Sequence, residues 1–185
     1  MSLRIAGGLL KGRVLKTPES ETTRPTTGML RQAVFNICQE WVSESRFLDI
    51  FAGSGAMGFE AISRGAGFVT FIESDKLASQ IIRDNAEAFL VQQQVQVLAI
   101  DAKQALAKLM SPYDLIYIDP PYDKDIPDVF RLIVERKLLA PRGLIFLEER
   151  FDSKKEMNFP HLELIGSRRY GGSHLHQFRH KVLDL

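Results

Sequence analysis

The chain has 185 residues, of which 45% are hydrophobic and 25% charged, enough for one domain with a sizeable core. Its 24 lysines and arginines nearly balance 23 acidic residues, so no overall basic field marks it as a nucleic-acid-binding protein. The single cysteine, Cys38, excludes an internal disulfide and an all-cysteine metal site. No apolar run approaches the roughly 20 residues of a membrane span, and we expect a cytoplasmic protein with no membrane partner.

Positive charge gathers in the N-terminal part of the chain. Residues 1–31 contain six lysines or arginines and two glutamates, an excess of four positive charges. Within them, residues 3–15 read as two short strands with glycine-permitted turns, which predicts a basic β-hairpin. Residues 16–25 are polar and predict a loop. We therefore expect residues 1–25 to form a small extension and residues 26–185 to form the main domain.

A helix is predicted after Thr26 and Thr27, which offer an N-cap. The apolar residues that recur there at helical spacing are Met29, Leu30, Ala33, Val34, Ile37, Cys38 and Trp41. They predict one buried face, on which Cys38 packs and does not act as a nucleophile. Arg31 lies off this face, where it either contacts a ligand or is solvated.

From residue 46 the pattern alternates between buried strands and helices. Strands are predicted at 46–50, 68–72, 95–100, 113–118 and 143–148, and helices at 59–64, 76–90, 104–110 and 127–139. Two further strands, at 162–169 and 175–183, flank the turn Gly171-Gly172. This order predicts an α/β fold, a mostly parallel sheet with helices on both faces that is finished by an antiparallel hairpin.

Glycines and carboxylates follow the predicted strands. Gly53, Gly55 and Gly58 have the spacing of a dinucleotide-binding fingerprint, and Glu73 lies at the ribose-binding distance of about 20 residues. Asp101 follows the third strand. The sheet brings these residues to the carboxyl ends of its strands, where ligands bind. Because NAD and S-adenosylmethionine both contain adenosine, the fingerprint alone does not separate them.

The fourth strand ends in the turn Asp119-Pro120-Pro121-Tyr122, because proline nitrogens cannot donate to a sheet. The turn offers an acidic side chain, backbone carbonyls and an aromatic ring side by side. These suit the exocyclic amine of a nucleobase, whose N–H groups bond to Asp119 and a carbonyl while the base stacks on Tyr122. Acceptors outside the plane of the amine favour the tetrahedral nitrogen that attacks a methyl group.

This turn favours S-adenosylmethionine over NAD, since hydride transfer has no use for it and the chain has little room for a separate substrate domain. Glu73 then holds the ribose and Asp101 the adenine amine, while the loop from Gly53 to Gly55 holds the methionine end. Asp49 contacts a water or the ammonium group beneath that loop. Each carboxylate alone also fits a helix N-cap or a solvated loop, but three at successive strand ends favour a binding site.

Four groups of segments match one known family. They are residues 4–8 with 11–13, residues 24–27 with Arg31 and Phe35-Asn36, residues 48–56, and residues 119–122. With them the chain resembles the bacterial RsmD family, the 16S rRNA guanine-N2 methyltransferases, over nearly its whole length. The glycine loop and the Asp-Pro-Pro-Tyr turn are shared by many amino-methyltransferases, so the N-terminal segments are the specific part. The chain departs from the family at Gly28, where an acidic residue is usual, and at Gln32, where glutamate is usual.

The resemblance implies a class I S-adenosylmethionine-dependent methyltransferase domain, Rossmann-like with a seven-stranded sheet. It implies that S-adenosylmethionine donates a methyl group to the N2 amine of one guanine, which is flipped from its stack into the pocket. The implied partner is 16S rRNA in the small ribosomal subunit or its assembly intermediate. We expect the enzyme to be a monomer.

The candidate site residues fall into three sets. The expected catalytic residues are Asp119, Pro120, Pro121 and Tyr122. The expected cofactor-binding residues are Asp49, Phe51, Ala52, Gly53, Ser54, Gly55, Glu73, Ser74, Asp101, Ala102 and Asp119. The expected RNA-binding residues are Arg4, Lys11, Arg13, Arg24, Thr27 and Arg31.

Two other functions remain open at this stage. The same turn serves enzymes that methylate adenine N6 in DNA, although this chain has no room for a target-recognition domain. A factor that binds S-adenosylmethionine and assists ribosome assembly without turnover is the second. His174, His176 and His180 share one side of the last strand, but no cysteine or carboxylate completes a tetrahedral set, so we expect no metal site.

Overall fold

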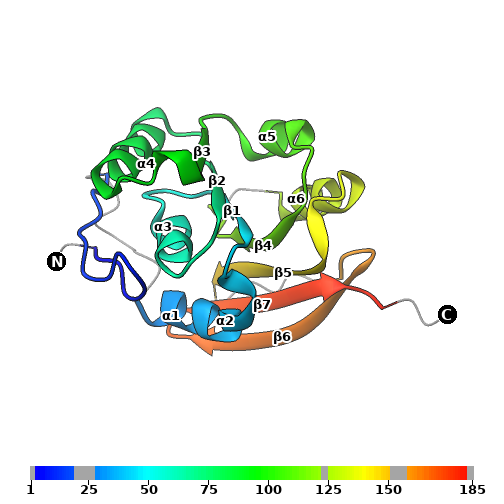
Figure 1. Cartoon of the computed structure of the whole chain (residues 1–185). Coiled ribbons are helices and arrows are strands. Elements are labelled where there is room, and N and C mark those ends of the chain that lie inside the picture. The colour runs from blue at the N-terminus through cyan, green and yellow to red at the C-terminus, as the bar shows by residue number, and fades with distance from the viewer. Residues whose placement is uncertain (1–2, 19–27, 122–124, 151–157, 183–185) are drawn as a thin grey trace.

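The computed structural model describes residues 3–18, 28–121, 125–150 and 158–182, and excludes the side chain of Arg150. Seven strands form one sheet in the order β3-β2-β1-β4-β5-β7-β6 (Figure 1). They are β1 (Arg46–Ile50), β2 (Phe68–Ile72), β3 (Val95–Leu98), β4 (Tyr113–Ile118), β5 (Leu139–Arg150), β6 (Leu162–Tyr170) and β7 (Ser173–His180). The first five strands are parallel, and β7 runs antiparallel to both β5 and β6. The expected mixed sheet with a terminal hairpin is confirmed.

Helices cover both faces of the sheet (Figure 1), and those that follow β1 connect the parallel strands. They are α1 (Gly28–Ile37), α2 (Gln39–Val42), α3 (Ala56–Ser63), α4 (Lys76–Phe89), the 3-10 turn η2 (Gln92–Gln94), α5 (Ala102–Lys108) and α6 (Ile126–Glu135). The connections run from β1 through α3 to β2, and from β2 through α4 to β3. The chain then returns to the other side of β1 through α5 and β4.

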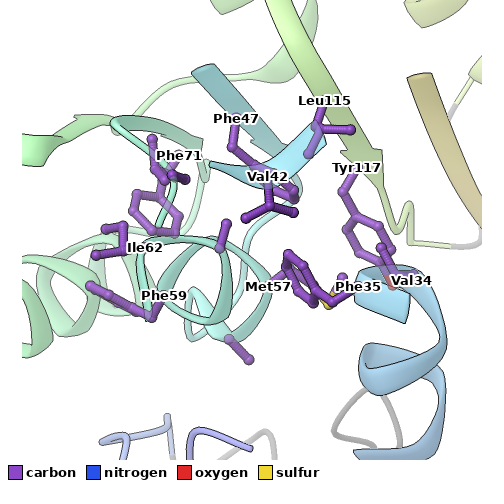
Figure 2. Packing of buried hydrophobic residues seen from close by; sticks show 14 of the residues in the cluster. Val34, Phe35, Val42, Phe47, Met57, Phe59, Ile62, Phe71, Leu115 and Tyr117 are labelled. Carbon is purple, nitrogen blue, oxygen red and sulfur yellow. The ribbon is translucent and has the colours of Figure 1, made fainter. Parts of the chain in front are cut away.

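Alternating strand residues divide the core into two clusters. Phe47 and Leu115 point to the face covered by α1, α3 and α4, whereas Leu48 and Ile116 point to the face covered by α5 and α6. Figure 2 shows the first cluster, with aromatic side chains from helices and strands packed together. The predicted apolar face of the first helix is confirmed at Leu30, Val34 and Cys38, which are buried in this cluster. It is wrong at Met29, which is 67% exposed, and at Arg31, which was expected off this face and is buried.

The bounds of several elements differ from those expected. α3 begins at Ala56, three residues early, because Gly55 ends the preceding loop with φ 80°. Similarly, α6 ends at Glu135 and β5 already begins at Leu139. Between them, Lys137 takes a left-handed φ of 54°, which a lysine adopts only under the constraint of its surroundings.

The predicted N-terminal hairpin is reduced to one isolated bridge between Arg4 and Val14. Its chain nevertheless doubles back, since Ile5 and Gly12 bond through their backbones. Ile5 and Leu15 are buried in the cluster that α1 and α3 share. No helix within the described ranges is long and apolar enough to cross a membrane.

Candidate active site

Four carboxylates stand in a row along one edge of the sheet. Asp101 follows β3, Glu73 follows β2, Asp49 lies near the end of β1, and Asp119 follows β4. Because the strand order is β3-β2-β1-β4 and all four strands are parallel, their carboxyl ends meet at one edge. The strand order reverses between β1 and β4, and such a switch point is where ligands bind in α/β sheets.

The loop that follows β1 has a strained backbone. Phe51, Gly53 and Gly55 take positive φ values of 63°, 54° and 80°. For Phe51 this conformation is costly, and such strain is typical of functional sites. A Cβ atom at Gly55 would lie 2.9 Å from Phe59, so the loop requires glycine there both for its backbone and for close packing.

Glu73 fixes this loop through its carboxylate. Its Oε2 accepts a hydrogen bond from the Gly53 nitrogen at 2.8 Å, and its Oε1 accepts one from the Asp75 nitrogen at 2.7 Å. Each carboxylate oxygen has a second acceptor position. The half-buried Glu73 is therefore rigid and still has acceptor capacity for ligand hydroxyls.

Asp49 lies beneath the loop and is 1% exposed. Its Oδ2 accepts a hydrogen bond from the Gly58 nitrogen at 3.0 Å. Burial raises the pKa of Asp49 well above its ordinary value of 3.8, and the nearby negative charges of Asp119 and Glu73 raise it further. The site is thus short of positive charge, and a cationic ligand group would relieve the repulsion.

The other expected cofactor contacts line the same edge. Asp101 is half-buried and caps α5 by accepting a hydrogen bond from the Lys103 nitrogen at 2.9 Å. Ser54 and Ala102 are buried, with 5% and 4% of their surfaces exposed, whereas Ser74 is exposed. Ala52, which is half-buried, bonds through its nitrogen to the Ile72 carbonyl.

These residues fit S-adenosylmethionine by the chemistry of their donors and acceptors. A strained glycine loop suits close approach of the methionine end, and the buried Asp49 suits a positive group. Carboxylates after β2 and β3 suit ribose hydroxyls and an adenine amine. The cofactor would supply an electrophilic methyl group on a positively charged sulfur.

The turn that was expected to be catalytic begins at Asp119, whose nitrogen donates to the Ile50 carbonyl at 3.4 Å. This bond ties the turn to the end of β1, next to the glycine loop. Asp119 and Pro120 are half-buried and Pro121 is exposed. Tyr122 lies outside the described residues.

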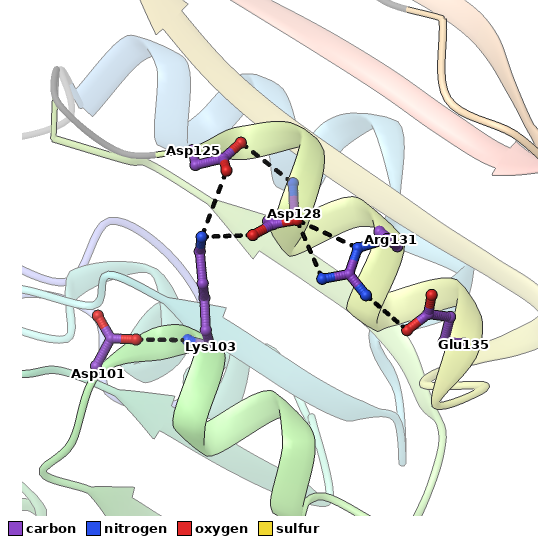
Figure 3. A network of polar contacts seen from close by, with 6 residues as sticks. All are labelled: Asp101, Lys103, Asp125, Asp128, Arg131 and Glu135. Carbon is purple, nitrogen blue, oxygen red and sulfur yellow. Dashed lines mark hydrogen bonds and ion pairs between the residues drawn. The ribbon is translucent and has the colours of Figure 1, made fainter.

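A polar network joins the first turn of α5 to the first turn of α6 (Figure 3). The Lys103 ammonium contacts Asp128 at 2.6 Å and Asp125 at 3.4 Å. Asp125 caps α6, the helix that follows Asp119, Pro120 and Pro121 in the chain. The network therefore holds the start of α6 beside the helix that Asp101 caps.

The expected RNA-binding residues that the structure describes do not gather at this edge. Lys11 and Arg13 are exposed, but Arg13 donates to the Ala88 carbonyl near the end of α4. Leu9, in the same turn, bonds to the Ser63 carbonyl at the end of α3. Since α3 and α4 begin at the carboxylate edge, their ends lie near the opposite edge of the sheet.

Arg4 is also exposed, and its guanidinium donates to the Gly12 carbonyl at 2.8 Å within the doubled-back segment. Arg24 and Thr27 lie outside the described residues, as does the boundary expected near residue 25.

The expected RNA contact by Arg31 is contradicted by its burial. Its surface is 3% exposed, and its Nε lies 3.4 Å from the fully buried Glu60 carboxylate. A second guanidinium nitrogen, Nη2, donates to the Arg4 carbonyl at 2.9 Å. Burial lowers the pKa of Arg31. This side chain holds the N-terminal segment against α3 and cannot reach RNA phosphates.

Glu60 is the residue that sequence reasoning missed. Its two oxygens accept hydrogen bonds from the Ala6 and Gly7 nitrogens at 2.8 Å each, and the Arg64 Nε donates to it at 2.9 Å. A glutamate in an otherwise apolar helix was the available signal, because an acidic residue is almost never fully buried without partners.

The histidines on β7 lie on the strand that pairs with β5 and β6. Among the described residues, no group of three or more histidine, cysteine, aspartate or glutamate side chains is arranged to hold a metal ion. His176 lies 3.8 Å from Glu149, and His180 contacts the Leu139 carbonyl at 3.1 Å.

Known proteins resemble this chain in sequence and structure. The family model described as "Conserved hypothetical protein 95" matches residues 3–179. Ribosomal RNA small subunit methyltransferase D of Escherichia coli (strain K12) is 35% identical over 152 residues, covering 82% of this chain and 76% of that protein. Putative rRNA methyltransferase YlbH of Bacillus subtilis (strain 168) is 35% identical over 150 residues, covering 79% of this chain and 82% of that protein.

Solved structures share the fold. The putative methyltransferase yhhF from Escherichia coli has a TM-score of 0.88 and 28% identity, covering 99% of this chain and all of that one. This likeness confirms the expected class I methyltransferase fold.

Proposed function

Because this chain belongs to the RsmD family, whose model is described as conserved hypothetical protein 95, we propose that it methylates small-subunit ribosomal RNA with S-adenosylmethionine. The observation that carries the proposal is the row of four carboxylates beside a strained glycine loop, ending in Asp119 and its two prolines. The relatives named above supply the class of substrate.

At the finer level, we propose the N2 amine of one guanine as acceptor, in 16S rRNA of the small subunit or its assembly intermediate. Asp119 and the Pro120 carbonyl accept hydrogen bonds from the amine, while Tyr122 stacks on the flipped base. Because the sulfur carries a positive charge that disperses as the methyl group leaves, positioning contributes more than acid–base catalysis. The enzyme works as a cytoplasmic monomer.

The test is methyl transfer with radiolabelled S-adenosylmethionine. Three substrates are compared: small-subunit rRNA, small subunits that lack the modification, and duplex DNA. Label recovered as N2-methylguanosine from the subunits is the expected result. Label recovered from DNA as N6-methyladenine would be consistent with the role proposed for the Asp119 turn but would refute rRNA as the substrate. Absence of label despite tight cofactor binding would refute the proposed methyl transfer.

Asp119→Ala tests the role of the turn. We expect turnover to fall by at least a hundredfold, because the amine loses its acidic acceptor, while the dissociation constant for S-adenosylmethionine changes less than threefold. The matched control is Glu87→Ala on the exposed face of α4, which should alter neither quantity. Equal losses of turnover and cofactor binding would refute the assigned role.

A further inference from the structure

A fifth carboxylate, Glu148 on β5, stands beside the row that ends at Asp119. β4 and β5 are parallel neighbours in the sheet, and Ile118 of β4 pairs with Leu147 of β5. One residue further along each strand, this register brings Asp119 and Glu148 to the same level at the carboxylate edge. Neighbouring strands lie about 4.8 Å apart, which is close enough for both side chains to contact one nucleobase.

The Glu148 side chain points to the face of the sheet on which α3 lies. Phe146, two positions earlier on β5, is buried in the cluster on that face, and strand side chains alternate between the two faces. Asp49 also lies on this face, since it bonds to the Gly58 nitrogen of α3. Glu148 is therefore on the same face as the carboxylate beneath the glycine loop.

Tyr117 holds one oxygen of Glu148 and leaves the other available. The Tyr117 hydroxyl donates a hydrogen bond to Glu148 Oε2 at 2.6 Å. Because Tyr117 is 1% exposed and belongs to the core cluster of Figure 2, it holds the carboxylate in a fixed direction. Glu148 itself is half-buried, and within the described ranges no residue bonds to its Oε1. This oxygen can accept a hydrogen bond from a ligand.

The need of the Tyr117 hydroxyl for a partner does not by itself explain a glutamate at this position. A buried hydroxyl requires one acceptor, which a neutral amide would supply without a second negative charge beside Asp119. A further carboxylate adds repulsion to a site that is already short of positive charge. Ligand N–H groups bonded to both carboxylates would offset this cost.

Guanine offers more N–H groups than the proposed contacts use. Its Watson–Crick edge carries two N–H groups on N2 and one on N1, and Asp119 with the Pro120 carbonyl accepts only the two on N2. The N1–H loses its water when the base enters the site, so it requires an acceptor too. Asp49, on the other side of β4, is 1% exposed and already bonds to Gly58. Glu148 is the neighbour of Asp119 with an available oxygen.

We propose that Glu148 accepts the N1–H of the target guanine and thereby selects guanine over adenine. Adenine has no hydrogen on N1, so its N1 lone pair would face the carboxylate oxygen and be repelled. The exocyclic amines of both bases could reach Asp119, whereas only guanine satisfies Glu148. This inference rests on the proposed function and names a specificity-determining residue of the same site.

The experiment compares guanine with 2-aminopurine, which keeps the N2 amine but has no hydrogen on N1. The guanine that wild-type protein labels is replaced by 2-aminopurine in small subunits assembled around the altered rRNA. For each base, kcat/KM is measured with wild-type protein and with Glu148→Gln, whose amide can still accept from Tyr117 and can donate to N1. The matched control is Glu163→Gln near the opposite edge of the sheet, where Glu163 pairs with Arg179 at 3.0 Å.

Wild-type protein should prefer guanine by at least about a hundredfold, because a site built to accept an N–H group rejects an analogue that lacks it. Glu148→Gln should lower this preference by at least about tenfold, since guanine loses a charge-assisted hydrogen bond and 2-aminopurine gains a bond. 2-Aminopurine also lacks the O6 oxygen of guanine, but this difference is the same for every protein and cancels in the comparison. Tm and the affinity for S-adenosylmethionine should be unchanged, and Glu163→Gln should keep the full preference.

Failure of the role of Glu148 and failure of the proposed function give different results. Equal kcat/KM for the two bases in wild-type protein would refute recognition of N1–H and leave the proposed function intact. So would a preference that is unchanged in Glu148→Gln. Wild-type protein that labels no rRNA would refute the proposed function and the role of Glu148 with it.

Discussion

At the scale of single residues, Asp49 combines a charge with complete burial. A carboxylate that is 1% exposed loses its hydration, and only the Gly58 nitrogen is seen to compensate it among the described residues. The free-energy cost of burying this carboxylate is tolerable in a binding site, because a positively charged ligand group can replace the lost hydration with an ionic interaction. In the proposed cofactor site, the burial of Asp49 would lower the stability of the ligand-free protein and raise its affinity for the cofactor.

We predict that Asp49→Asn stabilises the ligand-free protein increasingly as pH rises. The pKa of Asp49 is raised by burial in the folded state, so ionisation opposes folding, and wild-type stability declines as pH climbs above 3.8 toward the folded value. Thermal melts of both proteins between pH 4 and 8 measure the difference. Titration with S-adenosylmethionine should show binding at least tenfold weaker, since a charge-assisted hydrogen bond contributes about 1.5–3 kcal/mol.

A difference in Tm between these two proteins that does not vary with pH would contradict the prediction. So would wild-type cofactor affinity in the asparagine variant, because Asp49 would then carry no ligand charge.

Sequence reasoning placed the site carboxylates but not the role of Arg31. Glu73, Asp101 and Asp119 follow strands that the sequence defines clearly, so their shared edge could be predicted. The partner of Arg31 could not, because Glu60 lies 29 positions away and the backbone nitrogens that complete the cluster come from residues 6 and 7. Contacts between segments so distant in sequence leave no local periodic signal.

At the scale of elements, the strands were easier to predict than the helix ends. The strands at 46–50, 68–72 and 113–118 agree with the structure residue by residue. Gly67 and Glu73 bound the second of these β-rich runs, and Pro112 and Asp119 bound the third. The start of β5 was missed because Leu138 and Leu139 continue the apolar pattern of α6. The left-handed turn at Lys137 that separates them has no sequence signature.

The packing of α3 on β2 leads to a prediction about glycine. A Cβ at Gly58 would lie 2.2 Å from Phe71 Cε1 and 2.8 Å from Val69 Cγ1, and both side chains are fully buried. Gly58→Ala should therefore cost about 1–3 kcal/mol through overpacking, despite the roughly 1 kcal/mol that alanine gains in a helix. We expect Tm to fall by several degrees, measured by calorimetry.

Gly28→Ala is the matched control, because no atom lies within 4 Å of a Cβ built at this first residue of α1. Its Tm should stay constant or rise slightly. If Gly58→Ala raised Tm as Gly28→Ala is expected to do, helix propensity and not packing would govern position 58.

At the scale of the whole molecule, the N-terminal segment is bound into the fold through contacts on two helices. Glu60 of α3 accepts hydrogen bonds from the Ala6 and Gly7 nitrogens. Asn85 of α4 accepts a hydrogen bond from the Lys16 nitrogen at 2.9 Å and donates one to the Lys16 carbonyl at 3.0 Å. The same α3 begins at the glycine loop. The basic character of this segment could be read from the sequence, whereas its attachment to the helix that follows the glycine loop could not.

We predict that deletion of residues 1–15 destabilises the entire protein. The deletion removes Ile5 and Leu15, which are 2% and 3% exposed and contribute about 1.5–3 kcal/mol each. It also removes two hydrogen-bond donors from the buried Glu60 carboxylate, and each acceptor left unsatisfied should cost about 1–3 kcal/mol of stability. At roughly 2–4 °C per kcal/mol for a chain of this size, Tm should fall by more than 10 °C in one transition. Leu9→Ser, at a side chain 93% exposed, should leave Tm unchanged, and a truncated protein with wild-type Tm would show that the segment is a separable extension.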